Sequence, residues 1–211
     1  MLAAEGYEVR KAWWPISADV VQEIAAIKTE PIFNDNPDHT TDRKRRQAPV
    51  ATAWSRLVRR RLSAEFAPLR SSSMVVIESL PGCQRQAAHC DYIPTEELLA
   101  LEDAEMPLLF LLAIEPGTTI DLWPRSHHLL RSSGVKAKVP CHRVTVALEP
   151  GDAILFRADL VHAGSAYAAV NRRVHVYLDN PEHHRDPNRT WIIYKHAPRP
   201  LRALIDETEL P

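Results

Sequence analysis

The sequence has little glycine, few cysteines and no long apolar run, and each shortage narrows what the protein can be. Only 6 of the 211 residues are Gly, against 17 Pro, which favours a fold with rigid turns. Cys83, Cys90 and Cys141 match neither a zinc motif nor a disulfide framework, so we expect reduced thiols. The longest apolar run, Leu108–Ile114, is far too short to cross a bilayer.

Strong net charge and a targeting segment are also missing. A formal net charge of −1 gives no general electrostatic reason to bind nucleic acid or a membrane surface. Residues 1–6 have neither the basic region nor the apolar core of a secretory signal peptide. We therefore expect a soluble, cytoplasmic protein that forms a single domain over residues 1–211.

The first third of the chain predicts two helices. Ser17 is suited to cap a helix that ends before Pro31. Residues 1–16 and 31–49 predict no regular structure, because residues that resist it recur in the second stretch. A second helix is expected from apolar residues at helical spacing, namely Trp54, Leu57, Val58, Leu62 and Phe66.

Basic residues gather in the segment 42–70. The segment opens with Arg43–Arg46 and continues along the polar side of the second helix. One interpretation is a solvated helix face and loop. The alternative is a surface for nucleic acid or another polyanion, which we do not favour.

From residue 74 onward, short β-type runs separated by turns replace the helical pattern. Glu115-Pro-Gly and Glu149-Pro-Gly-Asp are turn signals between such runs. Helices followed by many strands predict a β barrel or sandwich with helices packed outside. A short helix from Thr95 to Leu101 is expected among the strands, which are 74–78, the stretch around His89, 108–114, 118–123, 143–149, 152–157, 173–178 and 191–194.

His89 and Asp91 carry the first chemical signature. Two positions apart on an extended strand, their side chains project from the same face, whereas Cys90 points to the other face and is expected to pack. An imidazole and a carboxylate aimed at one point are two thirds of the 2-His-1-carboxylate set that holds non-haem iron(II). A second H-x-D, His184–Asp186, has no strand to fix its geometry.

His162 is the expected third ligand. The turn Pro150-Gly-Asp launches an apolar strand that delivers His162 just before a loop of small residues. Asn171–Arg173 then opens a strand that can return antiparallel and bring a cation close to His162. The pairs His127-His128 and His183-His184 are expected to be exposed or to support the ligands rather than to bind metal.

Together these elements resemble the iron(II)- and 2-oxoglutarate-dependent dioxygenases, with the phytanoyl-CoA dioxygenase-like branch as the nearest match. Leu122–His127 is similar to that branch's P-G-S-H segment, but it has Arg125 where Gly is usual. The resemblance covers about residues 74–180. It implies a mainly β fold with flanking helices, a double-stranded β-helix (jelly-roll, cupin-like) barrel. We expect an N-terminal helical layer over 1–73, the barrel core over 74–195 and a tail over 196–211.

The resemblance implies roles for particular residues. His89, Asp91 and His162 would bind Fe(II), and Arg173 would pair with the distal carboxylate of 2-oxoglutarate. Arg172 is the rival anchor, because a slip of one residue in register exchanges the two faces of the strand. Gln86 and Ser165 are further expected contacts of the cosubstrate or substrate.

The implied reaction uses Fe(II), 2-oxoglutarate and O2, hydroxylates a small-molecule or side-chain substrate, and releases succinate and CO2. Asp91 favours hydroxylation, because halogenating relatives carry a small residue in its place. Two alternatives stay open: a zinc-dependent hydrolase with the same triad, and a non-enzymatic jelly-roll binding module. Arg173 argues against the hydrolase, which needs no buried cosubstrate anchor. Segment 92–107 is either a lid over the site or a surface helix.

Overall fold

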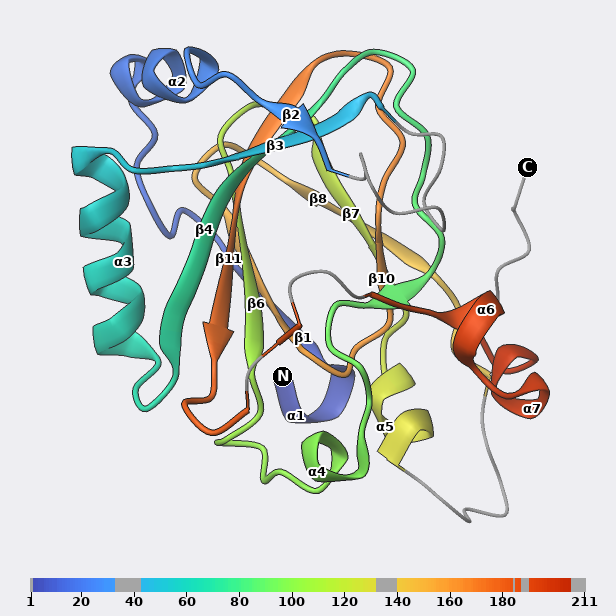
Figure 1. Cartoon of the computed structure of the whole chain (residues 1–211). Coiled ribbons are helices and arrows are strands. Elements are labelled where there is room, and N and C mark those ends of the chain that lie inside the picture. The colour runs from blue at the N-terminus through green and yellow to red at the C-terminus, as the bar shows by residue number, and fades with distance from the viewer. Residues whose placement is uncertain (1, 33–42, 132–139, 184, 187–189, 206–211) are drawn as a thin grey trace.

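Two antiparallel β-sheets form the body of the protein (Figure 1). The computed structural model describes residues 2–32, 43–131, 140–183, 185–186 and 190–205. The large sheet has the order β1 (Tyr7–Arg10), β9 (Ala153–Arg157), β6 (Leu108–Ala113), β11 (Asn171–Asp179), β4 (Arg70–Ser79), β3 (Arg45–Pro49) and β2 (Glu30–Pro31). The small sheet has the order β12 (Trp191–Ile192), β5 (His89–Cys90), β10 (His162–Gly164), β7 (Thr118–Leu122) and β8 (Val144–Leu148).

Helices flank the sheets, as expected of the N-terminal third. Ser17 caps α2 by accepting a hydrogen bond from the Val20 amide, and Thr52 and Ser55 form a reciprocal capping box at α3. Thr95 caps the short helix α4 in the same way. The helices are α1 (Leu2–Glu5), α2 (Ala18–Ala25), α3 (Ala53–Glu65), α4 (Glu96–Leu99), α5 (Ser126–Arg131), α6 (Ile193–His196) and α7 (Arg199–Arg202).

The outer face of the large sheet is apolar and is covered by the N-terminal helical layer. Helix α3 lies alongside β4 (Figure 1) and buries Val58 and Leu62 completely. Trp13 closes the same core, with its ring centroid 4.7 Å from that of Phe110 on β6. This burial of large apolar side chains provides the main stabilisation of the helices on the sheet.

The inner face of the large sheet divides into an apolar and a polar part. Alternate residues of β6 and β9 form an apolar core with β7 of the small sheet. Along β11 the same alternation turns Arg173, His175 and Tyr177 inward. The interior therefore has charged and hydrogen-bonding groups along β11, close to the small sheet that carries the histidines.

The expectation of irregular structure over 1–16 and 31–49 is wrong for parts of both stretches. Tyr7–Arg10 pairs with β9, Arg45–Pro49 pairs with β4, and β2 extends that edge of the sheet. β1 and β2 are the edge strands of the sheet and β3 lies next to β2. Pairing with other strands, rather than local propensity, makes these short segments extended. Residues 33–42 of the expected loop lie outside the described residues.

The C-terminal stretch also differs from expectation. The expected strand over 191–194 is limited to Trp191–Ile192, because Ile193 begins α6. His184 and residues 206–211 lie outside the described residues. In the part of the chain that the structure describes, no helix has both the length and the apolar character that crossing a membrane requires.

Four of the described arginines in segment 42–70 have separate environments. Arg45 is buried inside the barrel, whereas Arg46 donates to Thr29 on the outside. Arg59 donates to Ser71, and Arg61 lies over the ring of Trp13. These contacts give each of the four arginines a structural role of its own.

Candidate metal centre

Two histidines and one aspartate meet between the sheets. Strand pairing sets His162 directly opposite His89, and their ring centroids are 4.5 Å apart. Asp91 follows β5, and its Oδ1 lies 3.4 Å from His89 Nε2 and 3.8 Å from His162 Nε2. One ligating atom of each residue lies within 4.8 Å of the others. The three residues expected from the sequence are therefore brought together, with the spacing of ligands around one metal ion.

Both histidines are oriented by main-chain carbonyl groups. His89 Nδ1 lies 2.7 Å from the carbonyl oxygen of Ala87, and His162 Nδ1 lies 3.1 Å from that of Leu160. Because a carbonyl oxygen only accepts, each Nδ1 donates to it, which leaves Nε2 as the ring nitrogen that can bind a metal ion. Both Nε2 atoms face Asp91 Oδ1, as ligands of one metal ion do.

The carboxylate is also held in place. The Tyr177 hydroxyl donates to Asp91 Oδ2 over 2.8 Å, so that oxygen is engaged while Oδ1 faces the histidines. The guanidinium group of Arg185 stacks on the Tyr177 ring, with its Cζ 4.0 Å from the ring centroid. Asp91 is thus prepared to bind through one oxygen.

Burial and mutual interaction set the protonation of the triad. Burial lowers the pKa of His162 to about 3, assisted by His89 and opposed by Asp91. Burial alone would raise the pKa of Asp91, but the hydrogen bond with His89 and the electrostatic interaction with His162 lower it well below its usual value. At neutral pH the centre offers a carboxylate and a neutral imidazole from His162, the forms in which these groups bind metal.

Arg173 and Arg172 lie on opposite faces of β11. Arg173 is buried and donates from Nη1 to Ser79 Oγ at 3.1 Å and to Asn171 Oδ1 at 3.4 Å. Among the residues that the structure describes, no carboxylate pairs with it. Arg172 instead forms ion pairs with Glu78 and Glu115, each at 2.8 Å.

The environment of Arg173 is unfavourable for a cation. Burial lowers the pKa of Arg173 to about 10, with Tyr167 opposing this shift and the nearby guanidinium of Arg45 adding to it. Its Cζ lies 4.8 Å from the centroid of the Tyr167 ring, which partly compensates the charge. A buried Arg173 without a described carboxylate partner favours binding of an anion.

The two further expected contacts have different environments. Ser165 Oγ is buried and has no hydrogen-bond partner within the described part of the chain. Gln86 is engaged, because its Oε1 accepts from the Gly164 amide over 2.9 Å. The Ser165 hydroxyl is therefore available to a ligand, whereas Gln86 links the segment before His89 to the residues after His162.

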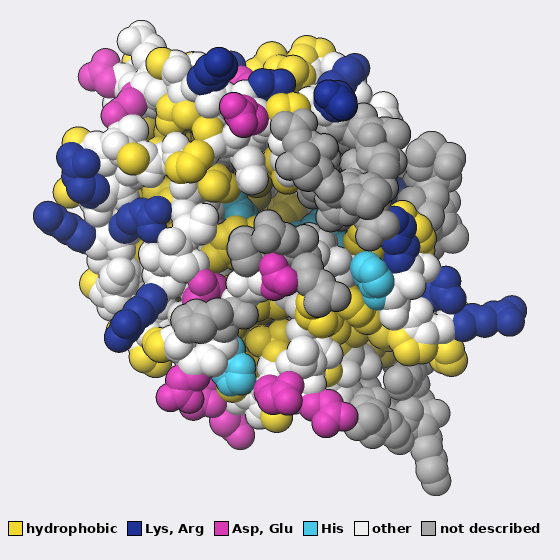
Figure 2. Space-filling view, viewed as in Figure 1, with side chains coloured by type: hydrophobic (Ala, Val, Ile, Leu, Met, Phe, Trp, Pro, Cys, Tyr) yellow, Lys and Arg dark blue, Asp and Glu magenta, His cyan; other side chains and the backbone are white. Residues whose placement is uncertain are grey.

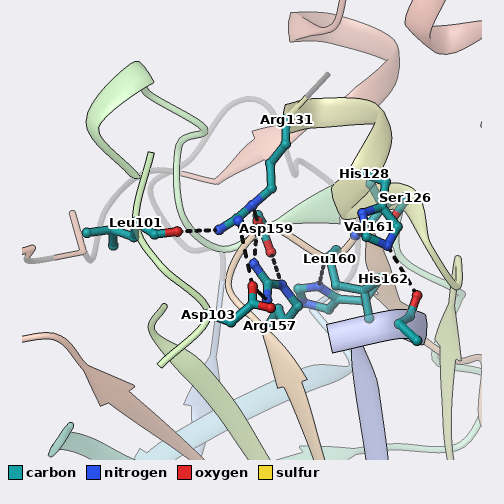
Figure 3. Close-up of polar contacts among 11 residues, drawn as sticks. Leu101, Asp103, Ser126, His128, Arg131, Arg157, Asp159, Leu160, Val161 and His162 are labelled. Atoms are coloured by element: carbon teal, nitrogen blue, oxygen red, sulfur yellow. Dashed lines mark hydrogen bonds and ion pairs between the residues drawn. The ribbon is translucent and has the colours of Figure 1, made fainter. Parts of the chain in front are cut away.

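A buried ion-pair network supports the turn before His162 (Figure 3). Asp159 receives two hydrogen bonds from Arg157, at 2.9 and 3.2 Å, and one from Arg131 at 2.7 Å. The same arginines bind Asp103 and the carbonyl oxygen of Leu101, which anchors the middle of segment 92–107. Burial would raise the pKa of Asp159, but Arg157 and Arg131 lower it.

The segment similar to P-G-S-H supports the same turn from another side. Ser126 Oγ accepts a hydrogen bond from the Val161 amide over 2.9 Å, one residue before His162 (Figure 3). Arg125 has φ +66°, in the left-handed region that favours glycine, which accounts for the usual Gly at this position. The departure at Arg125 thus changes the residue but preserves the backbone conformation.

Sequence reasoning left three residues of this centre without a role. It expected His175 and Tyr177 on the inner face, which is where they lie, but not the bond between Tyr177 and Asp91. Burial lowers the pKa of His175 to about 4, against the opposing effect of Asp91. Arg45 was missed because its segment was taken for a loop. Cys90 is fully buried in an apolar cluster, as expected.

The surface is hollowed above this region. Figure 2 shows a depression with histidine and hydrophobic side chains on its floor. Acidic side chains gather below it and basic ones above it in this view.

Two facing antiparallel sheets confirm the predicted double-stranded β-helix fold, which solved structures of 2-oxoglutarate-dependent enzymes share. Within this fold, His89, Asp91 and His162 form a candidate metal site. No known family model matches the sequence, and no curated protein matches it either.

Several solved structures share this fold. The non-heme alpha ketoglutarate dependent epimerase SnoN from nogalamycin biosynthesis is similar over 89% of this chain and 90% of its own, with 20% identity and a TM-score of 0.57. The carbocyclase SnoK is similar over 84% and 81%, with 20% identity and a TM-score of 0.57. HygX from Streptomyces hygroscopicus, solved with nickel, 2-oxoglutarate and hygromycin B, is similar over 85% of both chains, with 13% identity and a TM-score of 0.60.

Proposed function

We propose that this protein is an Fe(II)- and 2-oxoglutarate-dependent oxygenase that hydroxylates a small organic molecule. The observation that carries the proposal is the convergence of two Nε2 atoms and one carboxylate oxygen within 4.8 Å, in a barrel that also buries an arginine without a described carboxylate partner. A metal ion and an acidic cosubstrate together satisfy both features.

The residues of the centre fit Fe(II). Two imidazoles and one carboxylate oxygen would hold the ion, which is the ligand set of non-haem iron oxygenases. His89 and His162 are oriented by carbonyl groups and Asp91 by Tyr177, so binding requires little rearrangement.

The residues also fit 2-oxoglutarate. Its distal carboxylate would neutralise Arg173, whose buried charge is further disfavoured by Arg45. Ser165 Oγ, buried and without a described partner, would donate to the same ligand. Arg172 is already neutralised by Glu78 and Glu115, which favours Arg173 as the anchor.

When bound, iron and 2-oxoglutarate supply the oxidation of the substrate by O2, coupled to loss of CO2 from 2-oxoglutarate and formation of succinate. The chain's own residues hold and shield these groups. Tyr177 keeps Asp91 Oδ2 engaged, and Arg173 sets the orientation of the cosubstrate. Leu109, Leu111 and Phe156 form an apolar wall that excludes water.

Hydroxylation and a small-molecule substrate are the finer parts of the proposal. Asp91 keeps the carboxylate in the ligand set, which favours hydroxylation, although the similar structures include an epimerase and a carbocyclase. SnoN was solved with nogalamycin RO and HygX with hygromycin B, which supports a small molecule. Nucleic acid is not favoured as a substrate, because Arg46 and Arg59 of segment 42–70 are engaged in contacts within the protein.

Anaerobic titration of the protein with Fe(II) and 2-oxoglutarate tests the proposal. We expect a visible metal-to-ligand charge-transfer band and, after admission of O2, succinate formation that is lost in His162→Ala. Absence of the band, together with zinc-dependent ester or amide hydrolysis, would instead establish the hydrolase alternative.

A matched pair of variants tests the cosubstrate anchor. Arg173→Ala should raise the 2-oxoglutarate concentration needed for the charge-transfer band by at least about tenfold, because it removes charge-assisted hydrogen bonds. Arg172→Ala removes the same charge from the other face and should lower stability rather than 2-oxoglutarate affinity. The opposite order would assign the anchor to Arg172.

A further inference from the structure

Arg45 reaches from the large sheet to both segments that carry the histidine ligands. It lies on β3 and its side chain is almost fully buried, at 1% exposure. Its Nη2 lies 2.8 Å from the carbonyl oxygen of Gln84, 3.3 Å from that of Gly164 and 3.0 Å from that of Ser165. The first oxygen precedes His89 in the chain and the other two follow His162, so one guanidinium group joins the two segments.

Gln86 and Gly164 form the rest of this junction. The backbone N–H of Gln86 donates to the carbonyl oxygen of Gly164 over 2.9 Å. The side-chain Oε1 of Gln86 accepts from the backbone N–H of Gly164, also over 2.9 Å. These bonds continue the pairing of β5 with β10 beyond the opposed His89 and His162. The junction therefore lies on the same ladder as the two ligands, a few residues away.

Gly164 is required for the close approach of these groups. A Cβ atom at this position would lie 2.4 Å from Arg45 Nη1 and 2.4 Å from Gln86 Oε1, far inside van der Waals contact. The backbone of Gly164 thus makes room for the guanidinium group, and any side chain would displace it. A buried cation in this position is tolerated because carbonyl dipoles replace its water.

We propose that Arg45 is a positioning residue of the metal centre, which clamps the segment leading to His89 against the segment following His162. The clamp sets the spacing between the segment that leads into β5 and the end of β10, at Gln84, Gly164 and Ser165. It thereby sets the separation of the His89 and His162 Nε2 atoms. This inference rests on the proposed function, because it assumes that the two histidines bind one metal ion.

Co(II) affinity of the folded protein tests the inference. The titration follows the visible absorption of Co(II) in the metal-free protein and is compared with thermal unfolding of each variant. Arg45→Met should weaken Co(II) binding about tenfold or more, as loss of groups that orient metal ligands does. Arg45→Lys keeps the charge but not the planar group, and should restore only part of the affinity.

Arg46→Met is the matched control. Arg46 is the next residue of β3 and faces the other way, with its Nε 3.1 Å from Thr29 Oγ1. Its substitution removes the same charge and should leave Co(II) affinity unchanged. Gly164→Ala displaces the guanidinium group without altering it, and should weaken Co(II) binding as Arg45→Met does.

The possible outcomes distinguish a failure of this inference from a failure of the proposed function on which it rests. If Arg45→Met lowers thermal stability while Co(II) affinity stays at the wild-type value, Arg45 is structural only and the inference is overturned. If Arg45→Met does not fold, Arg45→Lys and Gly164→Ala decide in the same way. If the wild-type protein binds no Co(II), the proposed function fails, and the inference fails with it.

Discussion

Replacing Tyr177 by Phe removes a single oxygen from the metal centre and leaves the remaining packing in place. The ring keeps its edge contact with His175, at 4.7 Å between centroids, and its stacking with Arg185. What is lost is the 2.8 Å hydrogen bond from the hydroxyl to Asp91 Oδ2. The substitution therefore isolates the contribution of this bond to the orientation of the carboxylate.

Two effects of different size are expected from this substitution. A hydrogen bond to a buried charged group contributes about 1.5–3 kcal/mol, so the free energy of unfolding should fall by up to about 3 kcal/mol. Without the hydroxyl, Asp91 can rotate, and metal affinity should fall about 10- to 100-fold, as it does when groups that orient metal ligands are removed.

Tyr92→Phe provides the control for this experiment. The Tyr92 hydroxyl donates to Asp179, a buried carboxylate at the end of β11 that is no metal ligand. Calorimetric titration with Co(II) and urea unfolding should show lower stability for both variants but lower metal affinity for Tyr177→Phe alone. Equal Co(II) affinities of Tyr177→Phe and wild-type protein would refute the idea that Tyr177 orients Asp91.

Further predictions concern pH and the support of His162. The folded protein keeps His175 neutral down to about pH 4, whereas the unfolded chain protonates it near pH 6.5, so unfolding takes up a proton between these values. The free energy of unfolding of the metal-free protein should thus fall by about 2 kcal/mol from this one group between pH 6.5 and about pH 5, and by less in His175→Gln, as measured by urea unfolding. Asp159→Asn removes the buried carboxylate that pairs with both Arg157 and Arg131, leaves them with the more exposed Asp103, and should cost about 3–5 kcal/mol in the same assay, whereas Asp103→Asn should cost about 1 kcal/mol or less. Ser126→Ala leaves the Val161 amide without its acceptor and should cost about 1–3 kcal/mol, detected as a lower melting temperature; an unchanged melting temperature would contradict this role.

The residues of the candidate metal site could be proposed from the sequence because local patterns mark them. His89 and Asp91 stand two apart at the end of a strand. The turn Pro150-Gly-Asp begins β9, but β9 ends at Arg157 and His162 opens β10 in the other sheet, contrary to the expectation that one strand leads to His162. Gly151 has φ +91°, and a Cβ atom there would lie 2.4 Å from the Trp14 carbonyl oxygen, so this turn depends on glycine. Short-range rules of this kind need no knowledge of the rest of the fold.

Arg45 was not predictable because its role depends on distant pairing. Its neighbours in sequence are basic and precede Pro49, a pattern typical of an exposed loop. Only the pairing of β3 with β4, which sets Arg45 opposite Ser79, turns this one arginine inward. Tyr7–Arg10 is a similar case, since its pairing with β9 spans almost the whole barrel sequence.

The carbonyl groups that orient His89 and His162 have a consequence for how this site can diverge. In both cases the acceptor is the main chain two residues earlier, at Ala87 and at Leu160. Because every residue type has this carbonyl, substitutions at positions 87 and 160 cannot delete the hydrogen bond. The orientation of the two histidines is therefore inherited through the backbone whatever side chain stands at position 87 or 160, although packing restricts position 160, where Leu160 is fully buried in the core. Sequence comparison alone will not reveal this support.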